Sequence, residues 1–237
     1  MHFLLEALLN LLFPLPPGCQ LCGRTGDWDI CPTCSHWLVQ WEGKPKCQIC
    51  GRSLAYPGVL CQECQHRQPP FVQARAVGPY EGGLRDAIHL LKYKGRKTLV
   101  PLLGKLMLEL LQRQPELLRA ELVVPIPMSP GRRRQRGFNQ AELLAREVAR
   151  GLQLPLMSNV LTKPKETPPQ TGLDKNQRRE NLRGAFDVNT PEAIKGKAIL
   201  IVDDVFTTGS TMAEVAETLH KKGAGKLYVI TLANAGK

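Results

Sequence analysis

The sequence predicts an α/β fold, in which a parallel sheet flanked by helices follows a small cysteine-rich module. Three observations lead to this prediction. All eight cysteines lie in the first third of the 237 residues, as four C-x-x-C pairs. Residues 198–202 form a continuously apolar, mostly branched run, which is typical of a central parallel strand buried on both faces. Two acids, a loop of Thr, Gly and Ser, and an amphipathic helix follow this run, and α/β proteins build phosphate sites in this order.

The overall composition is that of a soluble globular chain. Hydrophobic residues make up 43% and charged residues 22%, so the chain can build one good core and a smaller module. The formal net charge is +11. Such a charge favours phosphate-rich partners, namely nucleotides, diphosphates, nucleic acid or anionic lipid. The alternative is that the excess of lysine serves solubility alone.

The first 18 residues are expected to form an apolar helix. Residues 1–17 contain no Lys or Arg, and Glu6 and Asn10 interrupt the apolar run. The run lacks the positive start of a secretory signal and is shorter than the roughly 20 residues of a membrane span. We therefore expect a cytoplasmic protein without a transmembrane segment, whose first helix packs against the rest of the chain or a partner. A peripheral membrane anchor is the weaker alternative, because the basic polar face is missing.

The cysteine pairs in residues 19–68 predict two structural metal sites. Two thiolates two residues apart on a tight turn can hold one tetrahedral ion. Without an export signal, metal binding is favoured over disulfides, and zinc over an iron–sulfur cluster. Pairing in chain order is expected, with an interleaved cross-brace as the alternative. The expected ligands of the first Zn²⁺ are Cys19, Cys22, Cys31 and Cys34, and those of the second are Cys47, Cys50, Cys61 and Cys64.

Residues 80–145 are expected to contribute helices and a strand to the α/β domain. Leu84, Ile88 and Leu91 share one face of a predicted helix. Residues 123–145 predict a strand, then a basic loop, then a helix that begins with Asn139 as N-cap and Glu142 as its capping-box partner. Residues 226–233 predict the last strand.

Two basic clusters are candidates for contact with phosphate groups. The first follows a predicted strand end, where α/β proteins bind ligands, and we favour contact with a diphosphate or a nucleic-acid backbone over a solvated loop. It consists of Arg132, Arg133, Arg134 and Arg136. For the second cluster, contact with phosphate groups and simple exposure to solvent are equally expected. It consists of Lys92, Lys94, Arg96 and Lys97.

Residues 162–183 are rich in Lys, Pro, Thr, Gln and Arg and predict a mobile loop, with an exposed linker as the alternative. The candidate ligand-binding residues of this loop are Arg178, Arg179, Asn181 and Arg183.

Residues 203–211 are the strongest candidate site. Ionised Asp203 and Asp204 can only accept hydrogen bonds, which suits the two donors of a ribose diol. The hydroxyls and backbone amides of the following loop suit a phosphate, and a glycine lets the backbone approach closely. The alternative is that the acids cap the next turn. The expected phosphate-binding residues are Thr207, Thr208, Gly209, Ser210 and Thr211.

The stretch V-D-D-V-F-T-T-G-S-T resembles the phosphoribosyl-diphosphate signature of type I phosphoribosyltransferases. In that family the acids hold the ribose hydroxyls and the Thr/Gly/Ser loop holds the 5′-phosphate. Together with the four C-x-x-C pairs and the R-G-F-N-Q motif, this makes the chain resemble the ComF/GntX family from about Leu8 to Ala233. That family joins a double zinc-ribbon region to a phosphoribosyltransferase-like domain.

The resemblance implies a type I phosphoribosyltransferase-like domain over residues 72–237, with a Rossmann-like parallel sheet. It implies phosphoribosyl diphosphate or a related ligand, Mg²⁺ on the diphosphate if the protein is a transferase, and a loop that closes over the substrate. It also implies a role in natural competence, with single-stranded DNA and DNA-uptake or recombination proteins as partners. A non-catalytic nucleic-acid adaptor and a ligand-sensing regulator remain alternatives, and the sequence names no acceptor base.

Overall fold

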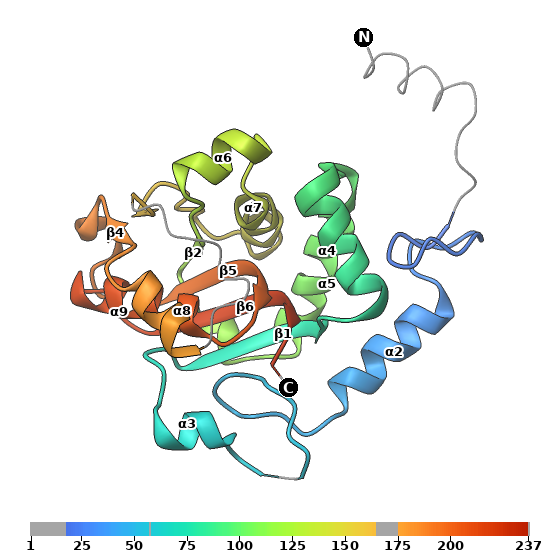
Figure 1. The fold of residues 1–237 in the computed structure, drawn as a ribbon, viewed down its shortest axis with the longest axis horizontal. Coiled ribbons are helices and arrows are strands. Elements are labelled where there is room, and N and C mark those ends of the chain that lie inside the picture. Colours follow the sequence, from blue (N-terminus) through green and yellow to red (C-terminus); the bar gives the residue numbers. More distant parts are fainter. Residues whose placement is uncertain (1–17, 57, 165–174, 237) are drawn as a thin grey trace.

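A computed structural model describes residues 18–56, 58–164 and 175–236. Its centre is a four-stranded parallel sheet in the order β1-β6-β5-β2, with helices on both faces (Figure 1). The predicted apolar helix at the N-terminus lies outside the described residues. The strands are β1 (Gln73–Pro79), β2 (Leu122–Pro125), β5 (Ile199–Phe206) and β6 (Leu227–Asn234).

Strand β5 is longer than the apolar run at residues 198–202 from which the sequence predicts it, and it does not end at the two acids. The strand continues through Asp203 and Asp204 to Phe206. The reason is that its neighbours differ in length. On one side β6 pairs with β5 as far as Phe206, whereas on the other side β2 pairs only as far as Val202. The last four residues of β5 are therefore paired with β6 on one side. On the other side they extend past the end of β2 and have no neighbouring strand among the described residues.

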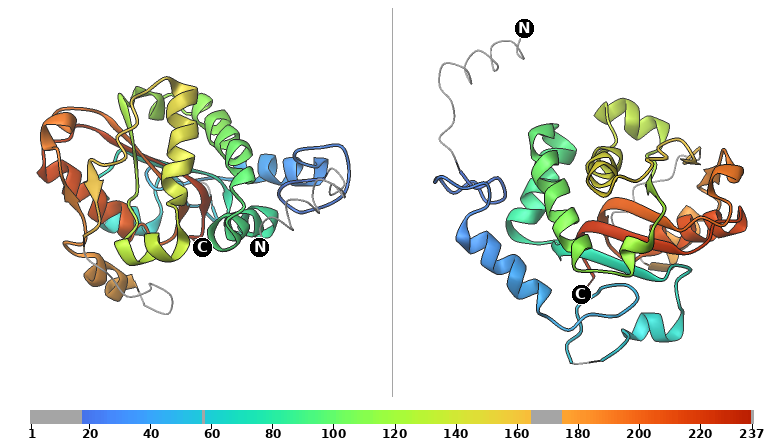
Figure 2. Two further views of the ribbon diagram at one scale, coloured as in Figure 1. Left: turned by 90° about the horizontal axis from the view of Figure 1, so that it is seen from above. Right: turned by 180° about the vertical axis from the view of Figure 1, so that it is seen from behind.

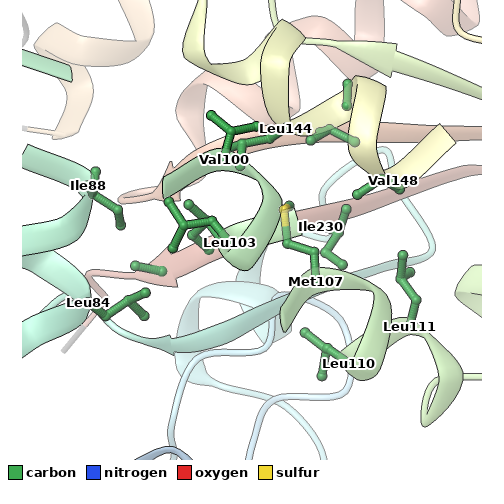
Figure 3. Close-up of a cluster of buried hydrophobic side chains, with 14 of the residues drawn as sticks. Leu84, Ile88, Val100, Leu103, Met107, Leu110, Leu111, Leu144, Val148 and Ile230 are labelled. Atoms are coloured by element: carbon green, nitrogen blue, oxygen red, sulfur yellow. The ribbon is translucent and has the colours of Figure 1, made fainter. Parts of the chain in front are cut away.

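Three helices cover one face of the sheet, and their apolar stripes form its core (Figure 3). The predicted stripe of Leu84, Ile88 and Leu91 is fully buried against this face. Leu144 and Val148 pack beside it against Leu200, Val202 and Ile230 of the central strands. The helices are α4 (Gly82–Lys94), α5 (Val100–Gln112) and α7 (Gln140–Leu152).

The opposite face packs against helix α9 and a small hairpin. Met212, Val215, Ala216 and Leu219 are buried, as their helical spacing predicts. The elements on this side are the antiparallel pair β3 (Leu161–Thr162) and β4 (Asp187–Val188), helix α8 (Lys175–Leu182) and helix α9 (Ser210–Lys221). Three short 3₁₀ turns complete the domain, η1 (Lys97–Leu99), η2 (Leu117–Arg119) and η3 (Pro191–Ile194).

The two cysteine-rich segments pack at different places. The first leads into α2 (Pro32–Glu42) beside α4, and the second leads into α3 (Gln62–His66) below β1 (Figures 1 and 2). Cys19 and Cys31 belong to the same core as Leu84, whereas all four cysteines of the second segment share the core of α9 with Phe71 and Phe206. Each segment is thus an integral part of one face of the molecule.

The direction in which successive strands are added to the sheet reverses between β2 and β5. After β2 the chain runs through α7 to the outer side of β2, where Leu156 pairs with Val123 in parallel. It then returns to β5 and continues through α9 to β6, in the opposite direction. Ligands of open α/β sheets bind outside the carboxyl ends of the strands at such a switch point. The two acids lie at this position.

Two segments predicted as loops contain helices. The basic run after β2 forms α6 (Pro130–Arg136), because Ser129 and Pro130 provide a favourable start and Gly137, with φ 79°, a left-handed end. The second half of the predicted mobile loop forms α8, while residues 165–174 lie outside the described residues. Among the residues that the structure describes, no helix is long and apolar enough to cross a membrane.

Candidate functional site

A cavity of about 670 Å³ lies at the carboxyl ends of β2 and β5. Its walls come from α4, the segment after β2, α6, the start of α7, and the residues after β3. Four cationic side chains and two carboxylates line it, so its lining carries a net positive charge. These charged residues are Lys92, Arg132, Arg136, Lys163, Asp203 and Asp204.

The two acids project from opposite faces of β5, because side chains alternate along a strand. Asp204 follows the face of Leu200 and Val202, is 4% exposed, and points to α4. Asp203 is half-buried and accepts a hydrogen bond from the Asp204 amide at 2.8 Å. Both acids reach the cavity because the edge of β5 is open there. They have different neighbours, so they are not equivalent acceptors.

Lys92 is a site residue to which the sequence assigned no clear role. Its Nζ lies 2.5 Å from Asp204 Oδ2. The sequence carried a signal for this, because Lys92 lies four residues after Ile88 and eight after Leu84, on the apolar stripe of α4. A cation at a core-facing helical position predicts a buried partner.

The pKa values of these groups reflect burial and mutual charge. Burial raises the pKa of Asp203 to about 7, and the charges of Lys92 and Lys163 oppose this shift. Burial lowers the pKa of Lys92 to about 8; the charge of Asp203 opposes this shift, and the charges of Arg136 and Arg132 add to it. Titratable groups near neutral pH inside a cavity are typical of functional sites.

The structure divides the four arginines of α6. Arg132 and Arg136, one helical turn apart, line the cavity. Arg133 forms an ion pair with Glu142 at 3.3 Å, and Arg134 is exposed; neither lines the cavity. The helix explains this separation, since residues four apart share a face and those between them do not.

The R-G-F-N-Q motif joins α6 to α7 and fixes the cavity wall. Asn139 is buried and caps α7, because its side chain accepts a hydrogen bond from the Ala141 amide at 3.1 Å. Its Nδ2 donates to the carbonyl of Ile126 at 2.9 Å, which ties the cap to the end of β2. The predicted N-cap is confirmed. The capping-box role of Glu142 is not observed, because its carboxylate pairs with Arg133 and Arg146.

The predicted phosphate loop lies between two cavities. Thr207 and Thr211 line the main cavity, at the start of α9. The three residues between them line a second cavity of about 290 Å³, which Cys50 and Cys64 also line. Gly209 has φ 80°, and a Cβ there would lie 2.8 Å from the Phe206 ring. Its lack of a side chain is therefore required both by the backbone conformation and by a close contact.

Arg183 of the predicted mobile loop is not brought to the cavity. Arg183 is exposed and lines a separate surface beside Glu214 and Glu217 of α9. The backbones of Arg178 and Arg179 belong to α8, and their side chains lie outside the described residues.

The cysteines form two four-residue clusters in chain order. Within each cluster all four sulfurs lie within 4.8 Å of one another. Cys22 and Cys31 have their sulfurs 3.7 Å apart, and Cys50 and Cys61 have theirs 3.6 Å apart. A tetrahedral zinc ion with Zn–S bonds of about 2.3 Å requires sulfurs about 3.8 Å apart, so the geometry fits zinc. Both sites fit closed structural zinc ribbons.

Known proteins resemble both parts of the chain. The Double zinc ribbon domain model matches residues 8–65, and the Phosphoribosyl transferase domain model matches residues 135–237. DNA utilization protein YhgH of Escherichia coli K12 is 33% identical over 224 residues, which cover 92% of this chain and 97% of that protein. Competence protein F of Haemophilus influenzae is 32% identical over 85% of this chain and 90% of its own length. The chain belongs to the ComF/GntX family.

Membership of the ComF/GntX family agrees with the fold described above. The sheet has the parallel order and flanking helices of a type I phosphoribosyltransferase-like domain, and an N-terminal cysteine-rich double zinc-ribbon region precedes it. Competence protein ComFC of Bacillus subtilis, also in this family, is 28% identical over 83% of this chain and 80% of its own length.

Proposed function

We propose that the cavity binds phosphoribosyl diphosphate or a related ribose 5-phosphate ligand. The observation that carries the proposal is the joint placement of Asp203, Thr207 and Thr211 in one cavity whose other walls are cationic. The amides at the start of α9 and the helix dipole favour an anion there. Asp203 offers an acceptor for ribose hydroxyls on the same cavity wall.

The cationic wall suits a second phosphate group. Arg132 and Arg136 face the cavity from α6, and guanidinium groups pair well with phosphate oxygens. Mg²⁺ fits this arrangement, because it prefers oxygen ligands and is commonly held by one or two carboxylates together with substrate phosphates. Bound to a diphosphate, it would neutralise the charge of that leaving group.

Displacement of diphosphate from C1 of the ribose by a nitrogen nucleophile is the reaction that such a site would support. The bond from C1 to the diphosphate oxygen breaks and a bond from C1 to nitrogen forms, through a transition state with oxocarbenium character. This reaction needs positioning and charge stabilisation and no covalent enzyme nucleophile. Asp203 would orient the ribose, and the start of α9 would hold the 5′-phosphate.

In the cell, we propose a cytoplasmic role in natural competence and DNA uptake, with single-stranded DNA as a partner. The names of the relatives support this, since they include a DNA utilization protein and competence proteins. We propose a division into an N-terminal apolar segment (1–18), a double zinc-ribbon module (19–68) and a phosphoribosyltransferase-like domain (72–237). The zinc module would then contact DNA or other uptake or recombination proteins.

A non-catalytic nucleic-acid adaptor is the second candidate function. The observation that favours it is the contact between Lys92 and Asp204, which occupies one of the two acids expected to hold the ribose hydroxyls. In this case the site would bind its ligand, or a nucleic-acid 5′-phosphate, without turnover.

Calorimetric titration tests the proposed ligand. Phosphoribosyl diphosphate with Mg²⁺ is titrated into zinc-loaded wild-type protein and into the Asp203→Ala/Asp204→Ala variant. We expect binding by the wild type and none by the variant, because the variant lacks the ribose acceptors. Turnover with an identified base would then favour the transferase over the adaptor. No heat of binding in the wild type would refute the proposed ligand.

A further inference from the structure

Three aromatic rings form a continuous row on the outer side of α4. His89 and Tyr93 are four residues apart, and their ring centroids are 5.3 Å apart in an edge-to-face arrangement. Tyr80, directly after β1, continues the row with its ring centroid 6.1 Å from that of His89. The Tyr80 hydroxyl and His89 Nε2 are hydrogen-bonded at 2.8 Å, which fixes the spacing of these two rings.

The row begins at the cavity and leads away from it. Tyr93 lines the cavity, whereas His89 and Tyr80 do not. Tyr93 is 67% exposed, which is a large exposed area for an aromatic side chain, and His89 is also exposed. The row therefore presents ring surface to the solvent outside the proposed ligand site. The exposed parts of Tyr93 and His89 are not covered by other described residues of the domain.

Cations accompany the rings. The Arg136 guanidinium lies 5.3 Å from the centroid of the Tyr93 ring, and Lys97 Nζ lies 4.9 Å from that of Phe138. Both rings line the cavity, so two aromatic–cation pairs form part of its wall. Residues 84–97 contain one acid, Asp86, which pairs with Arg85 at 3.6 Å. The cations in this range are Arg85, Lys92, Lys94, Arg96 and Lys97.

We propose that the row Tyr80–His89–Tyr93, with Arg136 and Lys97, is a binding surface for single-stranded nucleic acid that leads into the cavity. The proposal deepens the proposed function by assigning the DNA-contacting residues. Proteins that bind single strands without sequence readout combine aromatic rings, on which bases stack, with cations that follow the phosphates. The described surface contains both groups, with Arg136 at the Tyr93 end of the row.

The length of the row distinguishes a strand from a smaller ligand. A single nucleobase would need one ring, and of the three rings in the row Tyr93 is the one that lines the cavity. The other two rings extend the row by centroid steps of 5.3 and 6.1 Å and do not line the cavity. A duplex keeps its bases stacked on one another, so it cannot use the rings and would contact the cations alone.

Fluorescence anisotropy with a labelled oligodeoxythymidylate of about 15 nucleotides tests the surface in the full-length, zinc-loaded protein. The variants are His89→Ala and Tyr93→Ala, with Tyr93→Phe as the conservative change that keeps the ring. Leu118→Ala is the control, because Leu118 is a 43% exposed apolar side chain in η2, before the amino end of β2, and does not line the cavity.

Loss of one stacking ring is expected to raise the Kd for the oligonucleotide about fivefold to one hundredfold. Tyr93→Phe and Leu118→Ala should retain the wild-type Kd, and a duplex of the same length should bind more weakly than the single strand. An unchanged Kd in both His89→Ala and Tyr93→Ala would overturn the proposal. Equal affinity of wild-type protein for the duplex would also overturn it, since cations alone would then account for binding.

Titration of His89→Ala with phosphoribosyl diphosphate and Mg²⁺ separates this proposal from the proposed ligand. His89 does not line the cavity, so we expect the wild-type heat of binding together with weakened binding of the oligonucleotide. Lost oligonucleotide affinity in a protein that never bound the small ligand would refute the proposed ligand and retain the strand-binding surface. Equal loss of both ligands in His89→Ala would indicate damage to α4 and would overturn the proposal.

Discussion

At the scale of single residues, the site depends on how strand β5 presents its two acids. Alternation of side chains sends Asp204 towards α4 and Asp203 towards the opposite face. A carboxylate buried like Asp204 requires a compensating charge, and Lys92 supplies it from a helix more than 100 residues earlier in the chain. Asp203 is influenced by the charges of Lys92 and Lys163 but is not the acid that Lys92 contacts at 2.5 Å, and it is the better candidate for ligand binding.

The titration of Asp203 is the first prediction at this scale. Its carboxyl pKa is raised from the ordinary value of 3.8 to about 7, so the folded protein holds this proton where the unfolded chain releases it. Its contribution to stability is full below pH 3.8 and is lost as the pH rises to about 7. Carbon-13 NMR of the carboxyl should give a midpoint near 7.

The Lys92→Met variant provides the matched comparison. Since the charge of Lys92 opposes the upward shift, its removal should move the Asp203 midpoint still higher. Glu121→Gln serves as the control, because Glu121 pairs with Lys197 at 2.8 Å on another part of the surface and should leave the midpoint unchanged. A midpoint near 4 in the wild type, or a downward shift in Lys92→Met, would contradict this account of the site.

At the scale of elements, the loop between β5 and α9 depends on one glycine. Gly209→Ala should lower the free energy of unfolding by about 1–2 kcal/mol for its left-handed backbone and by about 1–3 kcal/mol more for contact with Phe206. Gly137→Ala is the matched control, because Gly137 has φ 79° and nothing within 4 Å of its added Cβ. Urea unfolding of both zinc-loaded variants measures the difference, and equal losses would show that the Phe206 contact is unimportant.

Several elements could be predicted from local sequence. The stripes of α4 and α9, the strand at β2 and the Asn139 cap follow from spacing and residue type, and the structure confirms them. The length of β5 could not be predicted, because it depends on which neighbouring strand ends first. Helix α6 could not be predicted from an apolar stripe, because none of its residues is buried, although Ser129, Pro130 and Gly137 mark its ends.

The residues of the site likewise divide into those that local sequence predicts and those that depend on tertiary packing. The loop after β5 could be located by composition, but its division between two cavities could not, because the cysteine-rich segment that forms the second cavity packs there through tertiary contacts. The separation of Arg132 and Arg136 from Arg133 and Arg134 required knowledge that the run is helical. The pairing of Lys92 with Asp204 depends on the packing of α4 against β5.

At the scale of the whole molecule, the two cysteine clusters support different parts of the protein. The second cluster is fully buried in the core that includes Phe206 and α9, and the carbonyl of Cys50 accepts a hydrogen bond from Asn234 of β6 at 3.4 Å. In the first cluster Cys22 is exposed. We infer that loss of the second metal site would disturb the sheet and the loop before α9, whereas loss of the first would remain more local.

Matched ligand variants test this difference. Cys64→Ser and Cys22→Ser should each reduce the zinc content from two ions to about one, because each site needs four thiolates. Cys64→Ser should lower the Tm by several degrees more, since about 1 kcal/mol corresponds to about 2–4 °C in a chain of this size. Differential scanning calorimetry together with metal analysis measures both quantities. A larger loss of Tm in Cys22→Ser would contradict the packing described above.

The central claim is that one cavity at the ends of β2 and β5 binds a ribose 5-phosphate ligand. A crystal structure of the zinc-loaded protein with phosphoribosyl diphosphate and Mg²⁺ tests it most directly. We expect the 5′-phosphate at Thr207 and Thr211, a ribose hydroxyl on Asp203, and the diphosphate towards Arg132 and Arg136. A ligand bound elsewhere, or a ligand in the cavity that does not contact Asp203, would contradict the claim.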